Sequence, residues 1–150
     1  MSTIAMQSDP FQDAMKGSFK SVLKWPQLSE FWARLTEQAD DHWYVYPVGE
    51  SVPAATLARQ ELLDFIGEID ALLHREHEHD YCGIVYVDDL QTPSIIKVYD
   101  PNNLGVSCGF STNPPLPGWV ISRLSPSLLL SAQAQTGSRR RWWNKILGKK

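Results

Sequence analysis

Hydrophobic positions alternate along two neighbouring stretches in the middle of the chain, residues 81–87 and 94–99. In the first stretch both alternating sets are largely apolar, as in a central strand that is covered on both faces. Lys97 interrupts the second stretch and suggests that one of its faces meets solvent at the edge. Asp88 and Asp89 lie between the stretches, where acidic residues commonly build turns. The pattern predicts an antiparallel hairpin around which the rest of the domain is arranged.

Apolar residues recur at helical spacing directly after Asp9. Asp9 can cap the N-terminus of a helix, and Pro10 suits its first position. The apolar positions are Phe11, Met15, Phe19 and Val22. Three lysines follow one another four residues apart beside them, Lys16, Lys20 and Lys24. We expect a helix that docks on the sheet and keeps a solvated lysine edge; a membrane or partner surface is the alternative.

Two longer stretches also repeat apolar residues every three or four positions. The first can begin at Pro26 and ends at residues 38–41, with apolar positions at Leu28, Phe31, Trp32 and Leu35. The second runs from about residue 53 to residue 77. Its apolar positions are Ala58, Leu62, Phe65, Ile66, Ile69, Leu72 and Leu73. Because the second helix is the longest, we expect it to lie across the sheet as the main core helix.

Two further strands complete the predicted sheet. Residues 42–48 are rich in aromatic and β-branched residues, which favour strands, and Pro47 and Gly49 end this stretch. Residues 119–124 can return as a fourth strand after a long loop. The predicted fold class is therefore α+β, with about four antiparallel strands and two or three helices packed on them.

The length and composition fit one folded domain with tails. The chain has 150 residues, of which 43% are hydrophobic and 11% aromatic, enough for one core. We divide it into a disordered N-terminus (1–8), an α+β domain (9–130), a linker (131–138) and a basic tail (139–150). No run of about 18 apolar residues occurs, and the use of two cysteines fits a reducing compartment. We expect a cytoplasmic protein that the tail can hold at the periphery of a membrane or an assembly.

Charge is distributed unevenly along the chain. The formal net charge is -3, but residues 139–150 contain six Lys or Arg residues and no acid. The preceding 138 residues contain eight basic and seventeen acidic residues, so their net charge is -9. Because nucleic acids bind to basic faces, we expect no nucleic acid on the body and place any anionic partner at the C-terminus.

The basic tail also carries apolar residues at helical spacing. Two tryptophans, an isoleucine and a leucine would share one side of a helix, and basic residues would occupy the remainder. A merely disordered end rarely carries such a pattern, since exposed apolar residues promote aggregation. We therefore predict that the tail docks on a partner protein or on an anionic membrane surface. The predicted docking residues are Arg139, Arg140, Arg141, Trp142, Trp143, Lys145, Ile146, Leu147, Lys149 and Lys150.

Possible metal ligands cluster at the end of the longest predicted helix. Imidazole and thiolate groups bind zinc, and imidazole also suits nickel. The spacing matches no established metal motif, and histidines at a helix C-terminus are also favoured by the helix dipole. The candidate ligands of zinc or nickel are His74, His77, His79 and Cys82.

Residues 100–118 are rich in Gly, Pro and Asn and predict a long loop between two strands. Loops of this length are commonly functional in compact domains, so we expect recognition by the body to occur here. Residues 105–109 read GVSCG, but the residues that follow cannot begin the helix that a hydrolase nucleophile turn requires. Cys108 is a candidate reactive thiol, with a histidine of residues 74–79 as its base. The candidate recognition residues are Asp100, Asn102, Asn103 and Cys108.

The tail is the strongest functional pattern, so the leading hypothesis is a non-catalytic adaptor or accessory protein without a cofactor. Its domain would be tethered through the basic, Trp-rich segment to a partner protein or an anionic surface. The alternative is a metal-binding or thiol-dependent enzyme, or a metallochaperone, that uses the residues from His74 to Cys82 and the Cys108 loop. The metal content of the purified protein would distinguish the two hypotheses.

Overall fold

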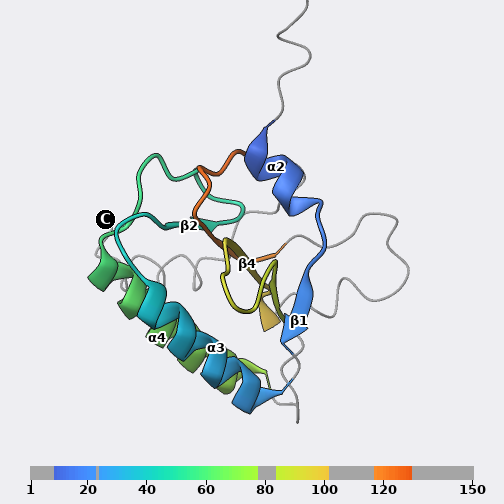
Figure 1. Cartoon of the computed structure of the whole chain (residues 1–150), viewed down its shortest axis with the longest axis vertical. Helices are drawn as coiled ribbons and strands as arrows, with labels where there is room; N and C mark the ends of the chain where they lie inside the picture. Colours follow the sequence, from blue (N-terminus) through green and yellow to red (C-terminus); the bar gives the residue numbers. More distant parts are fainter. Residues whose placement is uncertain (1–8, 23, 78–83, 102–116, 130–150) are drawn as a thin grey trace, which may run out of the picture.

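The computed structural model describes residues 9–22, 24–77, 84–101 and 117–129 (Figure 1). These residues form a five-stranded antiparallel sheet with three helices, so the predicted α+β class is confirmed, with one strand more than expected. The strand order in the sheet is β1-β3-β4-β5-β2. The elements are α2 (Pro10–Met15), β1 (Lys20–Val22), α3 (Trp25–Gln38), β2 (Tyr44–Pro47), α4 (Arg59–Glu76), β3 (Val85–Val87), β4 (Ile95–Val98) and β5 (Trp119–Ser122).

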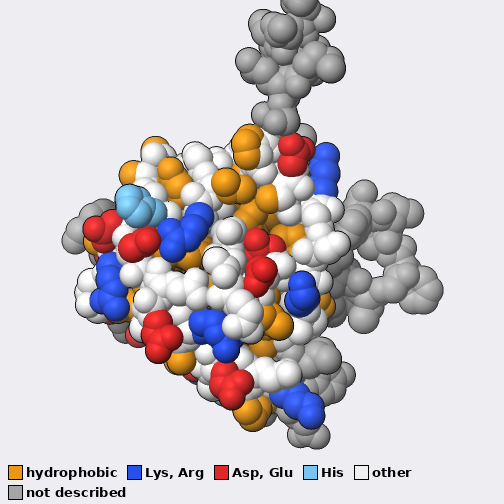
Figure 2. Space-filling model, viewed as in Figure 1, with side chains coloured by type: hydrophobic (Ala, Val, Ile, Leu, Met, Phe, Trp, Pro, Cys, Tyr) orange, Lys and Arg blue, Asp and Glu red, His pale blue; other side chains and the backbone are white. Residues whose placement is uncertain are grey.

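The helices α3 and α4 cover one face of the sheet (Figure 1). Their predicted apolar stripes are buried except at Ala58, which is exposed and precedes α4, so the main core helix and its neighbour are confirmed. Trp25 at the start of α3 stacks on His74 near the end of α4, with ring centroids 4.2 Å apart, so the two helices run antiparallel. α4 begins at Arg59 and not near residue 53, because the Glu61 carboxylate accepts a hydrogen bond from the Ala58 N–H (2.9 Å) and caps the helix there. Charged side chains lie over this helix layer (Figure 2).

A second, smaller core lies on the opposite face of the sheet. It contains Phe11, Tyr46, Val48, Ile95, Val120 and Leu129, and α2 with the segment after β5 covers it. The Tyr46 hydroxyl accepts a hydrogen bond from the Leu129 N–H (3.2 Å). Because both faces of β5 are covered, all four of its residues are buried, which agrees with the predicted strand and explains its nearly continuous apolar run.

The predicted helix over Asp9–Val22 is wrong in its second half. α2 is capped by Asp9 as expected, but it ends at Met15, and Lys20–Val22 form β1. Val22 pairs with Val85 and is 2% exposed in the larger core. Pairing with a distant strand therefore overrides the local helical spacing of the apolar residues, which carries only a weak preference over so short a stretch.

The predicted central hairpin is confirmed as the pair β3 and β4. Residues 81–83 of the predicted first strand lie outside the described residues, and Ser94 and Tyr99 lie just outside β4. The Asp88 carboxylate accepts hydrogen bonds from the N–H groups of Ser94 (2.9 Å) and Ile95 (3.1 Å), which closes the turn. Lys97 corrects the expectation of a solvent-facing edge. Its ammonium donates a hydrogen bond to the Met15 carbonyl (3.0 Å) and lies 3.8 Å from the centre of the Phe19 ring, and burial lowers the pKa of Lys97.

Candidate binding cleft

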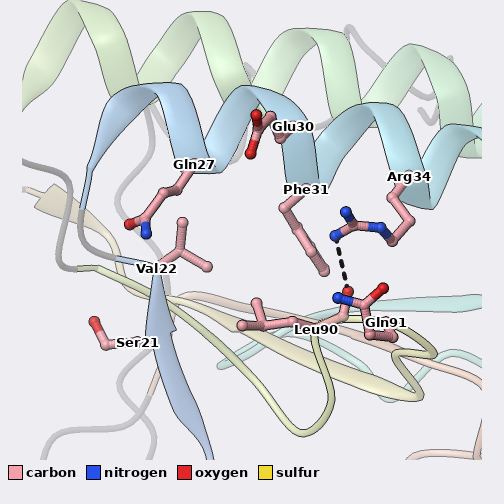
Figure 3. A pocket seen from close by; sticks show the side chains of 8 residues that line it. All are labelled: Ser21, Val22, Gln27, Glu30, Phe31, Arg34, Leu90 and Gln91. Atoms are coloured by element: carbon pink, nitrogen blue, oxygen red, sulfur yellow. Dashed lines mark hydrogen bonds between the residues drawn. The ribbon is translucent and has the colours of Figure 1, made fainter.

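A cleft of about 200 Å³ opens between α3, β1 and the turn that joins β3 to β4 (Figure 3). Val22 points into it from β1 and Phe31 from α3, and Leu90 extends from the turn. Polar and charged side chains surround this apolar floor. The described lining residues are Ser21, Val22, Gln27, Glu30, Phe31, Arg34, Leu90 and Gln91. A small apolar floor with a few polar groups at its rim suits the binding of one side chain of a ligand or partner.

Two hydrogen bonds from α3 hold the turn in place at one side of the cleft. The Arg34 guanidinium donates to the Leu90 carbonyl (3.1 Å), and the Gln38 amide donates to the Gln91 carbonyl (2.8 Å). Within the turn, the N–H groups of Thr92 and Gln91 donate to the Asp89 carboxylate and hold the pKa of Asp89 below its ordinary value. The cleft wall is therefore fixed by contacts of its own.

The ionisable groups among the described lining residues are one carboxylate and one guanidinium, those of Glu30 and Arg34. Glu30 and Arg34 lie four residues apart on α3. Gln27 lies three residues before Glu30, so all three side chains are on the same side of the helix. The Gln27 side-chain oxygen already accepts a hydrogen bond from the Lys24 N–H (3.0 Å) at the helix start. This combination offers hydrogen bonds and charge at the rim of an apolar floor.

The two predicted metal ligands that the structure describes, His74 and His77, both lie against the ring of Trp25. His74 Nε2 lies 3.4 Å from an Asp70 carboxylate oxygen, and the same oxygen accepts a hydrogen bond from Trp32 Nε1 (3.1 Å). Within the described ranges, no group of three or more His, Cys, Asp or Glu residues could hold a metal ion. The other two candidate ligands, His79 and Cys82, lie outside those ranges, so the zinc or nickel site stays a prediction.

Of the predicted recognition residues, the structure describes Asp100, which is 8% exposed. Asp100 lies directly against Gly118, where an added β-carbon would come within 3.1 Å of the Asp100 β-carbon. The Gly118 N–H donates to the Val98 carbonyl (2.9 Å), so the two ends of the predicted loop meet beside β4 and β5. Asn102, Asn103 and Cys108 lie outside the described residues.

The predicted docking residues of the tail, all within 139–150, also lie outside the described residues. Among the helices that the structure does describe, none is long and apolar enough to cross a membrane. No protein-family model, curated protein or solved structure matches the chain. Functional inference therefore depends on the chain's own chemistry and geometry.

No local pattern in the sequence predicts the cleft. Glu30 and Arg34 are visible in the sequence as polar positions beside the stripe of α3. The apolar floor, however, depends on Val22, which belongs to a strand that the helical spacing concealed. The edge position of β1 is set by its pairing with β3, more than sixty residues later, and no local pattern carries that information.

Proposed function

We propose that this protein is a non-catalytic adaptor whose basic, Trp-containing tail docks on a partner protein or on an anionic membrane surface. The observation that carries the proposal is the composition of residues 139–150, which combine six basic residues with two tryptophans after a body of net charge -9. Such a segment binds anionic surfaces through charge and apolar contact together.

The magnitudes favour a weak and reversible attachment. Each Lys or Arg near an anionic bilayer contributes about 1 kcal/mol, so six contribute about 6 kcal/mol at most. Burial of the apolar side chains adds to this, whereas ordering a segment of about twelve residues opposes it. Because the charge contribution is screened within about 8 to 10 Å at ordinary ionic strength, added salt should release the protein.

A few charged side chains of the body are engaged in contacts within the fold. Arg123 forms an ion pair with Asp40 (3.2 Å) and lies 4.4 Å from the ring centre of Trp43. Asp88 and Asp89 build the hairpin turn. The proposal therefore assigns docking to the tail and not to these side chains.

The test compares the full chain with a chain that ends at Ser138, in flotation with anionic and with neutral vesicles. We expect the full chain to float with anionic vesicles at low salt, and the shortened chain to stay in solution. The double variant Trp142→Ala/Trp143→Ala keeps every charge but should float less. Replacement of Arg139, Arg140 and Arg141 by Gln should weaken flotation and also reduce its dependence on salt. Pull-downs with a purified acidic partner test the protein alternative. Equal behaviour of the full and shortened chains in both assays would contradict the proposal.

The metal or thiol alternative has a separate test. It is favoured by one contact, the approach of the half-exposed His74 imidazole to Asp70, since a carboxylate commonly orients a ligating histidine. Metal analysis of the protein purified without a histidine tag should then find zinc or nickel in a fixed ratio, and His74→Ala or Cys82→Ala should lower that ratio. A metal-free protein that binds neither ion in titration would contradict the alternative.

A further inference from the structure

Among the described strands, β1 lies at one edge of the sheet, and its outward backbone groups can be assigned from the register. Asp88 directly follows β3, and its N–H donates to the Ile95 carbonyl (3.2 Å). The backbone groups of Asp88 therefore point toward β4. Backbone groups point to alternate sides along an antiparallel strand, so Val87 and Val85 bond toward β1 instead. The residue between their two β1 partners is Ser21. Its N–H and C=O therefore point away from the sheet, and no described residue pairs with them.

Three exposed lysines follow this edge. Lys16 ends α2, Lys20 lies on β1, and Lys24 precedes α3. We name them the lysine strip. After the hydrogen bonds from Thr92 and Gln91, the charge of Lys20 also contributes to the lowered pKa of Asp89. Within the described part of the chain, no ion pair holds Lys16 or Lys24. Figure 2 shows basic side chains along the side of the molecule where α2, β1 and the start of α3 lie. The strip is thus a row of exposed basic side chains on an acidic body.

We propose that the β1 edge, the lysine strip and the adjoining cleft bind an extended acidic peptide segment of a partner protein. The peptide backbone would pair with the outward N–H and C=O of Ser21 as an added strand. Lys20 and Val22 lie two residues apart, so their side chains share one face of β1. A peptide that places an acidic residue beside Lys20 and an aliphatic residue beside Val22, two residues apart, would pair its carboxylate with the strip and fill the cleft.

The combination of groups selects a peptide over other anionic ligands. Three lysines on a body of net charge -9 are few for a nucleic acid or a lipid surface. The cleft needs an apolar side chain, and the edge needs a backbone partner. The opposing explanation is protective, because lysines on short edge strands prevent pairing between copies of a protein. This second docking surface does not depend on the tail, and truncation at Ser138 should leave it intact.

The test measures binding of labelled eight-residue peptides to the full chain by fluorescence anisotropy. The probe is Glu-Thr-Val-Thr repeated twice, and its controls carry Lys in place of Glu or Pro in place of the second Thr of each repeat. We expect the acidic probe to bind as an antiparallel strand, with the Thr between Val and Glu opposite Ser21. The Pro-containing peptide of equal charge should bind about tenfold more weakly or worse, because its proline at that position has no N–H to donate to the Ser21 carbonyl. The basic peptide should not bind measurably.

Two protein variants locate the site. Ser21→Pro removes the outward N–H without removing a bond to β3, so the fold should persist while the acidic probe binds about tenfold more weakly or worse. Lys20→Glu/Lys24→Glu should weaken binding at least as much. Lys149→Glu/Lys150→Glu makes the same charge change in the tail and should leave binding within about twofold. The proposal would be overturned if the natural chain did not bind the acidic probe at millimolar concentration, or if the tail variant lost as much binding as the β1 variants. It would also be overturned if a β1 variant self-associated while the natural chain bound no probe.

Discussion

Gly67 is a residue whose substitution by alanine should stabilise the fold. It lies on the exposed side of α4, and a β-carbon added there would meet no atom within 4 Å. Glycine inside a helix is less stable than alanine by about 0.5 to 1 kcal/mol, because it loses more backbone freedom on folding. We therefore expect Gly67→Ala to raise the free energy of unfolding by about that amount in urea titrations. Gly17→Ala is the control: its β-carbon would lie 3.2 Å from the Ala14 carbonyl oxygen, so it should give no gain.

The elements differ in how much of them local sequence could predict. α3 and α4 were predictable because long stripes of apolar residues repeat over several turns, and β5 because a continuous apolar run follows a turn-rich segment. β1 was not, since three residues are too few for a period and their strand state depends on pairing with β3. The same dependence conceals the cleft, whose floor joins β1 to the turn after β3. The local sequence pattern thus predicts the longer helices and strands, whereas the cleft depends on pairing between strands that are distant in the sequence.

The core positions of these elements should be sensitive to truncation. Phe65 of α4 is fully buried, and Ile84, just before β3, is 4% exposed. Phe65→Ala and Ile84→Ala each remove packed apolar atoms and leave a cavity, so each should lower the free energy of unfolding by about 2 to 5 kcal/mol. Ala33→Ser on the exposed side of α3 should change it by less than about 0.5 kcal/mol. Losses below about 1 kcal/mol at both core positions would mean that the assigned core is wrong.

At the scale of the whole molecule, the two ends of the described chain fasten the second core layer together. The Ser127 hydroxyl donates to the Asp9 carboxylate (2.7 Å) and accepts from the Gln12 amide (2.8 Å), and Gln12 also donates to the Leu128 carbonyl (3.0 Å). Asp9 in turn caps α2. The layer that covers Tyr46 is thus closed by contacts more than a hundred residues apart in sequence, whereas the helix layer on the other face has its own core.

Ser127→Ala should therefore loosen one layer and leave the other in place. Loss of these two hydrogen bonds at a partly buried site should lower the free energy of unfolding by about 1 kcal/mol. Amide exchange should quicken in α2 and around Leu129 but not in α3 or α4. Ser125→Ala, at an exposed position nearby, is the control.

The same contact predicts a pH dependence with a defined sign. The hydrogen bond from Ser127, followed by that from the Gln12 N–H, lowers the pKa of Asp9 below its ordinary value of 3.8. A carboxyl group whose pKa is lower in the folded state stabilises the fold above its unfolded pKa, and this contribution is lost as pH falls through the folded pKa. In Ser127→Ala the Asp9 pKa should rise toward 3.8, which NMR titration can follow. The stability difference between the natural chain and the variant should then narrow as pH falls below about 4. A difference that stays constant down to the acid transition would show that the carboxylate of Asp9 does not hold the two ends together.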